Sequence, residues 1–127
     1  MNTSKNQITG SVPTDHKFIE LYKNVMTGEL PFYSALIKQE GIVPFSDYKP
    51  TIPRAYLHFI IHQIGLEYMP KLHVYQENDK FIMSDDYNTY YSYILLNVKN
   101  IPCYVMGEPI GEYVLEKQKI ADSVLVI

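Results

Sequence analysis

Residues 79–106 constrain the fold of this chain more than any other part of its sequence. The segment begins with the short apolar run 81–83, which predicts a strand, and it ends with a second such run at 101–106. Between the runs, tyrosine and aliphatic side chains recur at helical spacing, which predicts a helix that ends near Asn97 and Asn100. A strand, a helix and a strand in direct succession indicate an α+β fold. The inner face of the helix is predicted to carry Tyr87, Tyr91, Ile94, Leu95 and Val98.

The N-terminal part of the chain predicts a flexible lead followed by helices. Residues 1–14 are polar and form the lead, and residues 15–127 are expected to form a single globular domain. Asp15, or the threonine before it, can cap a helix that ends at Gly28. A second short helix is predicted over 31–39, because a proline occupies its first turn and a glycine follows its end.

The middle of the chain predicts short strands and a further helix. The run 42–45 contains a proline and therefore suits an edge strand. Residues 53–65 predict an amphipathic helix that ends at its glycine. The runs 72–75 and 81–83 flank a polar turn and predict a hairpin. The positions that define the amphipathic pattern of the helix are Tyr56, Phe59, Ile60, Gln63 and Ile64.

Composition and charge exclude several classes of function. The formal net charge is −3 and the basic residues are scattered, so a general electrostatic footprint for nucleic acid is absent. Arg54 is the only arginine, so several guanidinium groups cannot clamp one phosphate. Cys103 is the only cysteine and lies in an apolar run, which predicts a buried inert thiol. Neither a signal peptide nor an apolar run of the ~20 residues that span a membrane is present, so a cytoplasmic location is expected.

The order of these elements resembles the ParB/sulfiredoxin-like domain over roughly residues 42–106. Residues 42–48 are similar to its opening strand and polar turn, and residues 57–65 to the helix and glycine before its next strand. Residues 81–105 follow the family's strand, D-G-x-H-R type motif, helix and final strand. The resemblance implies a small mixed β-sheet with helices packed on it, here preceded by N-terminal helices.

The residues at the motif depart from the family pattern. Asp85 takes the acidic position, Asp86 stands where glycine is expected, and Thr89 replaces the arginine. In active members, the resemblance implies that this loop and helix N-terminus hold phosphate or another anion. Two carboxylates here stabilise the helix start by about 0.3–1 kcal/mol each, and they repel phosphate. Tyr87 and Asn88 replace the polar or histidine positions.

Several interpretations of this junction and of the histidines are open. An acidic residue can simply cap the helix, which is the favoured interpretation. Asp85 and Asp86 can bind a cation, although adjacent carboxylates alone do not make an octahedral site, and Asn88 and Thr89 can retain some anion binding. His58 and His62 have metal-ligand spacing, but no glutamate lies between them as a general base, which favours solvated side chains. No metal site or cofactor is predicted.

The sequence favours a non-catalytic binding or regulatory module that contacts a protein partner. The predicted contact surface consists of Tyr90 and Tyr93, which point away from the expected core face, beside Asp85 and Asp86. One alternative is a nucleotide-dependent or nuclease-like enzyme that has rebuilt a divalent-cation site from Asp85, Asp86, Asn88 and Thr89. The other alternative is a nucleic-acid-binding module that uses Lys49, Arg54 and Lys71. The runs 113–115 and 124–127 both predict strands, and the run at the C-terminus, 124–127, also allows a homodimer through edge pairing.

Overall fold

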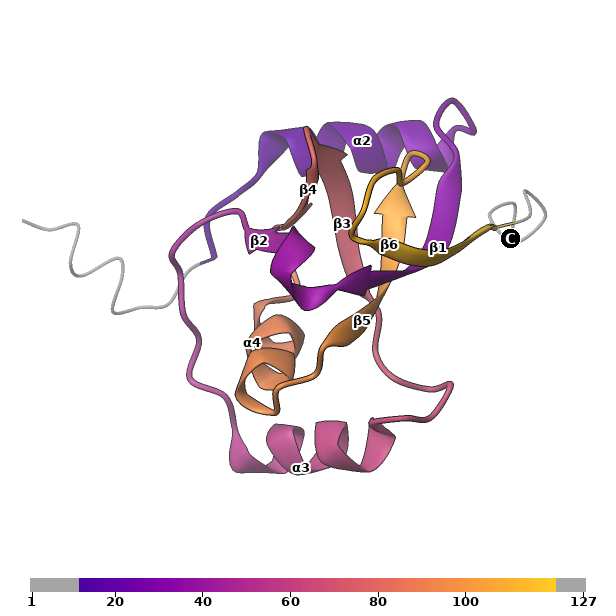
Figure 1. Cartoon of the computed structure of the whole chain (residues 1–127). Coiled ribbons are helices and arrows are strands. Elements are labelled where there is room, and N and C mark those ends of the chain that lie inside the picture. The colour runs from indigo at the N-terminus through magenta and orange to yellow at the C-terminus, as the bar shows by residue number, and fades with distance from the viewer. Residues whose placement is uncertain (1–11, 121–127) are drawn as a thin grey trace, which may run out of the picture.

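The computed structural model describes residues 12–120 of the chain, and the predicted α+β class is confirmed. Six strands form one mixed sheet in the order β2-β4-β3-β5-β1-β6. Figure 1 shows α2 and α4 on opposite sides of the sheet, with α3 farthest from the strands. The elements are α2 (His16–Met26), β1 (Phe32–Lys38), the 3-10 turn η1 (Gln39–Gly41), β2 (Ile42–Pro44), α3 (Arg54–Gln63), β3 (Leu72–Glu77), β4 (Lys80–Met83), α4 (Tyr87–Leu95), β5 (Asn100–Met106) and β6 (Val114–Lys119).

The main core lies between one face of the sheet and α4. The neighbouring central strands β3 and β5 run parallel, and Leu72 pairs with Cys103 while Val74 pairs with Val105. These side chains are fully buried because alternate residues of a strand face the same side of the sheet. Tyr93 of α4 and Ile60 of α3 belong to the same core cluster, so both helices are anchored on this face.

A smaller core lies on the opposite face, under α2. Val25 of the helix packs with Tyr75 and Met106 from the central strands. Asp15 caps the helix by accepting hydrogen bonds from the backbone N–H groups of Lys17 and Phe18. The predicted cap is confirmed, and it fixes α2 on the sheet because the Asp15 carboxylate also accepts the Tyr75 hydroxyl proton at 2.7 Å.

The predicted helix over 31–39 is wrong, because Phe32–Lys38 is strand β1. This strand pairs antiparallel with β5 on one side and with β6 on the other. Ala35 and Ile37 face the core and alternate with less buried neighbours, which is the period of a strand. Backbone pairing with segments distant in the sequence therefore overrides the local helix signals of the proline and glycine that flank it.

Several local predictions are confirmed. Asn78 (φ 58°) forms the tight turn of the β3–β4 hairpin, and Asn97 (φ 57°) follows α4. Gly65 (φ 86°) lies just after α3 and adopts the left-handed conformation that glycine favours. Pro44 lies in β2, an edge strand of the sheet, as predicted.

Most of the predicted N-terminal lead and the predicted strand at 124–127 lie outside the described residues. The predicted strand at 113–115 corresponds to the start of β6 (Val114–Lys119). Within residues 12–120, no helix is long and apolar enough to cross a membrane.

Candidate functional site

The β4–α4 junction ties the start of α4 to the start of β3. Asp86 occupies the N-cap position of α4, but its carboxylate makes no cap hydrogen bond. It accepts instead from the backbone N–H of His73 at 2.8 Å and lies 3.2 Å from Nδ1 of the same residue. The register between β3 and β4 begins at Val74, so His73 lies just beyond the paired ladder. Asp86 therefore satisfies a strand N–H that β4 no longer reaches.

The imidazole of His73 is held in an acidic environment. Its hydrogen bond to Asp86 raises the pKa of His73, burial opposes this effect, and the nearby charges of Asp86 and Asp85 add to the rise. The ring also packs against Tyr104 with 5.4 Å between centroids. The Lys71 ammonium lies over the ring of the same Tyr104, 5.3 Å from its centroid.

A cavity of about 250 Å³ opens at the α4 N-terminus. It brings together the predicted site residues Asp85, Asp86, Asn88 and Thr89, whereas Arg54 is not among the lining residues. Arg54 lies exposed at the first position of α3. The cavity thus gathers carboxylates without the positive charge that a bound phosphate needs. No group of three or more His, Cys, Asp or Glu side chains able to hold a metal ion occurs within residues 12–120.

The hydroxyl groups of this cavity make structural contacts. Thr89 is buried, and its hydroxyl is hydrogen-bonded to that of Tyr56, which joins α4 to α3. The hydroxyl of Tyr87 is 2.8 Å from that of Ser46. The Tyr87 ring also makes an edge contact with Tyr48, with 5.1 Å between centroids. The position at which the resemblance places an arginine is therefore used here to attach one helix to another.

The predicted contact surface of Tyr90 and Tyr93 is wrong, because both side chains lie in the core. Tyr90 is 7% exposed and Tyr93 is 0% exposed. Their polar ends donate to backbone carbonyls, from Tyr90 to Ile42 and from Tyr93 to Pro70. Leu95, which was predicted to face inward, is exposed instead. A tyrosine can occupy a core position when its hydroxyl finds a partner there, and helical spacing alone does not report that partner.

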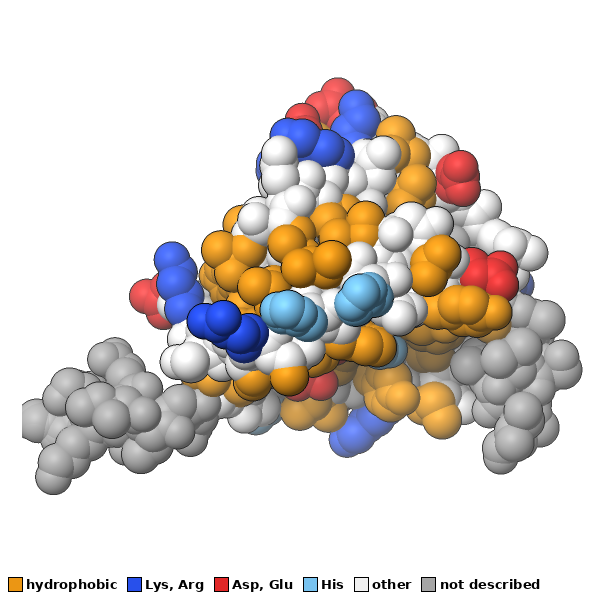
Figure 2. Space-filling model, turned by 90° about the horizontal axis from the view of Figure 1, so that it is seen from below, with side chains coloured by type: hydrophobic (Ala, Val, Ile, Leu, Met, Phe, Trp, Pro, Cys, Tyr) orange, Lys and Arg blue, Asp and Glu red, His pale blue; other side chains and the backbone are white. Residues whose placement is uncertain are grey.

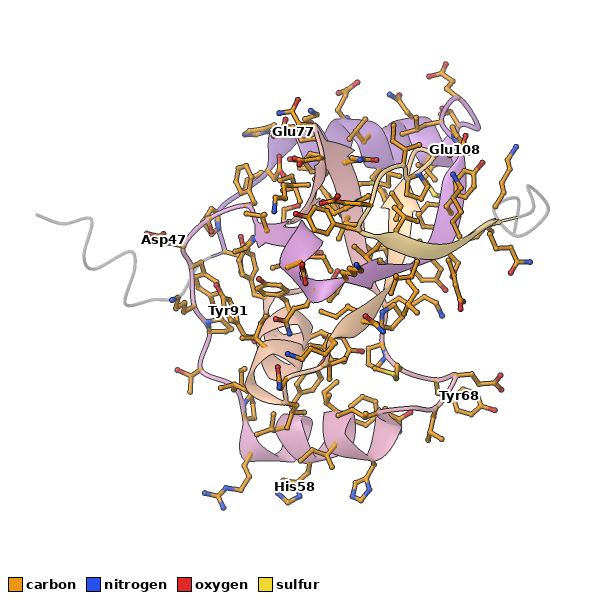
Figure 3. All side chains as sticks on the ribbon, in the orientation of Figure 1. Asp47, His58, Tyr68, Glu77, Tyr91 and Glu108 are labelled. Carbon is orange, nitrogen blue, oxygen red and sulfur yellow. The ribbon has the colours of Figure 1, made fainter. Side chains whose placement is uncertain are left out.

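Sequence reasoning missed a surface on α3 and the segment that follows it. Phe59 and Ile61 are each 46% exposed, and Tyr68 is 72% exposed. Figure 2 views the molecule from this side and shows hydrophobic side chains gathered around histidines. In Figure 3, His58 and Tyr68 point away from the body of the molecule. We use "the α3 surface" for the exposed side chains Phe59, Ile61, Ile64, Leu66 and Tyr68.

The sequence contains a signal for this surface. Phe59, Ile60 and Ile61 are consecutive, so their side chains point in different directions around the helix. Only Ile60 is buried, because α3 contacts the rest of the fold along one side. Phe59 and Ile64, which belonged to the predicted amphipathic pattern, therefore remain exposed on the flanks of the helix.

Comparison with known proteins identifies similar backbone arrangements. No protein-family model and no curated protein matches the chain. The structure of sulfiredoxin from Arabidopsis thaliana has a TM-score of 0.48 at 15% identity and covers 60% of this chain and 86% of its own. The C-terminally truncated chromosome-partitioning protein ParB from Caulobacter crescentus, complexed with CTP-gamma-S, has a TM-score of 0.43 at 13% identity.

The ParB comparison covers 62% of this chain and 46% of the ParB chain, so this chain spans less than half the length of that structure. Both comparisons agree with the predicted resemblance to the ParB/sulfiredoxin-like domain. The similarity concerns the fold alone and carries no information about activity.

Proposed function

We propose that this chain is a non-catalytic protein-binding module and that the α3 surface is its contact surface. The exposure of Phe59, Ile61 and Tyr68 on and beside one helix carries the proposal. Exposed apolar side chains that gather on one side of a folded domain, as in Figure 2, mark interaction sites, whereas isolated ones are ordinary. Large apolar and aromatic side chains are also the residues that dominate the energetics of protein interfaces.

The geometry of α3 supports this proposal. The helix rests on the fold through the buried Ile60 and the hydroxyl contact of Tyr56 with Thr89. Its flanking residues Phe59 and Ile61 are thereby held on a preformed scaffold. A preformed surface needs little ordering when it binds, which favours affinity. The partner is a protein that offers a complementary apolar face.

The contacts at the β4–α4 junction support the absence of catalysis. Asp86 is engaged by His73, and the hydroxyls of Tyr87 and Thr89 are engaged by other side chains. A general base or a nucleophile needs a reactive atom that can reach a substrate. The only arginine, Arg54, lies outside the cavity at this junction.

Site-specific photo-crosslinking tests the proposed contact surface. A photoreactive amino acid replaces Tyr68, and in a matched control it replaces the exposed Tyr22 on α2. We expect a discrete protein adduct from position 68 that is absent from position 22. The adduct should be lost when Phe59→Ser and Ile61→Ser are combined with the probe. The purified adduct partner should then bind the Phe59→Ser variant at least about tenfold more weakly, a change of about 1.4 kcal/mol.

Equal adducts from both positions, or an adduct at position 68 that the serine variants leave unchanged, would overturn the proposal. The same holds if no adduct forms at position 68. Circular dichroism of the serine variants controls for folding, and we expect native spectra because neither replaced side chain belongs to a core cluster.

Calorimetry with nucleotides tests the absence of catalysis separately. CTP, ATP and GTP are titrated with and without Mg²⁺, and we expect no binding because Asp85 and Asp86 repel phosphate at the cavity. Micromolar binding that disappears in Asp85→Ala would contradict the non-catalytic assignment.

A further inference from the structure

We propose that His58 and His62 form half of a transition-metal site, of the Zn²⁺ class, that a second copy of this chain completes. The inference rests on the proposed function, since it names the partner of the α3 surface as another molecule of the same protein. Each copy supplies two imidazole ligands, and the metal lies on the two-fold axis between antiparallel α3 helices.

The positions of the histidines on α3 make them a bidentate pair. His58 and His62 are four residues apart within the helix Arg54–Gln63, so they lie on the same side in successive turns. Both side chains are exposed, and in Figure 3 His58 points directly away from the fold. Two histidines at this spacing on a formed helix can bind one metal ion through their ring nitrogens.

Both imidazoles are available for a metal ion. Among the described residues, one histidine forms an ion pair, namely His73 with Asp86. In the same part of the chain, neither His58 nor His62 forms an ion pair or a side-chain hydrogen bond. Metal ligation needs an imidazole nitrogen that is not already occupied by another partner. The pair therefore differs from His73, whose ring nitrogen is held by Asp86.

A second copy supplies what one chain lacks. Zinc in a closed protein site takes four ligands in tetrahedral geometry, with nitrogen about 2.0–2.1 Å from the metal. The described part of this chain offers the histidine pair no third His, Cys, Asp or Glu close enough to complete a metal group. In a two-fold symmetric dimer both copies use the same surface, so an axis through the metal gives four histidine ligands from two copies.

The surroundings of the pair suit a helix-to-helix contact. Ala55 lies one turn before His58 and is exposed, and its small side chain lets two helices approach closely. Phe59 and Ile61 flank the histidines on either side, and the contact would remove both from water. Figure 2 shows this arrangement of hydrophobic side chains around the histidines.

The charges at the two ends of the pair are self-complementary. Arg54 precedes His58 by one helical turn, and Glu67 follows His62 at the other end of the segment. Both are exposed. In an antiparallel two-fold contact, each arginine lies toward the glutamate end of the other copy. A parallel contact would place like charges together, so the charges favour the antiparallel arrangement.

Sedimentation with and without zinc tests the inference on the full chain. We expect the 14.8 kDa mass of one chain in EDTA and twice that mass in ZnCl₂, with one zinc bound for every pair of chains. His58→Gln and His62→Gln should each abolish the zinc-dependent dimer, whereas His16→Gln on α2 should leave it intact. Mg²⁺ should have no effect, because it prefers oxygen ligands.

Several outcomes would overturn the inference. These are a chain that stays monomeric at all zinc concentrations, zinc bound to a single chain without a change of mass, and a zinc-dependent dimer that persists in both glutamine variants. A dimer that forms equally in EDTA and is lost in Phe59→Ser overturns the metal site and retains the proposed function. A monomer in zinc whose position-68 probe still gives an adduct with another protein also separates the two failures.

Discussion

The Asp86 carboxylate accepts the backbone N–H of His73 and contacts its ring nitrogen through the same oxygen, at 2.8 and 3.2 Å. This residue stands where the resemblance places a glycine that would let an anion approach. The carboxylate instead closes the end of the β3–β4 ladder. The charge of Asp86 therefore stabilises the fold, and the strength of its contact depends on whether the His73 imidazole is protonated.

The stability that Asp86 provides should therefore depend on pH. The pKa of His73 is raised above its usual 6.5 in the folded chain, chiefly by the hydrogen bond to Asp86. The charged contact is fully present below about pH 6.5 and is lost as the pH rises through the folded pKa. Urea unfolding should show a larger loss of stability for Asp86→Asn at pH 5.5 than at pH 8.

Two variants control this measurement. His73→Gln should remove most of the pH dependence of the Asp86→Asn effect, because the titrating partner is gone. Asp85→Asn should change the pH dependence of stability less than Asp86→Asn does, because Asp85 acts on His73 only through its charge. An equal loss of stability for Asp86→Asn at both pH values would contradict the proposed link.

The hydroxyl contact between Tyr56 and Thr89 should couple α3 to α4 energetically. Tyr56→Phe and Thr89→Val each remove one hydroxyl, and each should lower the free energy of unfolding by about 1 kcal/mol. The double variant should lose less than the sum, since the second change removes a group already left unpaired. Denaturant unfolding of the four proteins measures this coupling, and strictly additive losses would show that the contact contributes nothing.

Local signals in the sequence predicted the elements that local chemistry decides. The Asp15 cap, the β3–β4 hairpin and the glycine after α3 depend on residues within a few positions of one another. Their preferred backbone conformations and hydrogen bonds are the same in most folds. For that reason, the ends of α2 and α3 and the hairpin could be predicted from the sequence alone.

Long-range pairing and helix rotation could not be predicted in this way. Phe32–Lys38 is a strand because β5 and β6 lie on either side of it, and neither is near it in the sequence. The predicted contact surface of Tyr90 and Tyr93 was wrong for a related reason. Tyr93 has an amphipathic side chain, and its position inside the core depends on a carbonyl of Pro70 that only the fold brings near.

The two functions of Asp15 predict that its loss destabilises the chain more than the loss of its partner hydroxyl. Asp15→Ala removes the α2 cap, worth about 1 kcal/mol, and leaves the Tyr75 hydroxyl without its acceptor, at a cost of about 1–3 kcal/mol. Tyr75→Phe removes the hydroxyl but keeps the cap. In thermal unfolding, Asp15→Ala should have the lowest melting temperature, Tyr75→Phe an intermediate one and the parent chain the highest. The reverse order would contradict the dual function of Asp15.

The Cys103 thiol should be unreactive in the folded chain. It is fully buried, and burial raises the pKa of Cys103, which disfavours the thiolate that reacts. A disulfide reagent at pH 8 should label the thiol at once in denaturant and at least about a hundredfold more slowly without it, because local or global opening must come first. Rapid labelling of the native chain would contradict the packing of β5.

Gly41 should be hard to replace because Tyr113 occupies the space beside it. A Cβ atom at Gly41 would lie 2.5 Å from Cγ and 2.6 Å from Cβ of Tyr113, at the base of that side chain rather than its flexible end. The backbone of Tyr113 accepts a hydrogen bond from Lys38, so the base cannot easily move away. Gly41→Ala should therefore cost about 1–3 kcal/mol of unfolding free energy. In a Tyr113→Gly background, which removes both of these atoms, the same change should cost much less. An unchanged cost would assign the effect to the backbone of Gly41 and not to this contact.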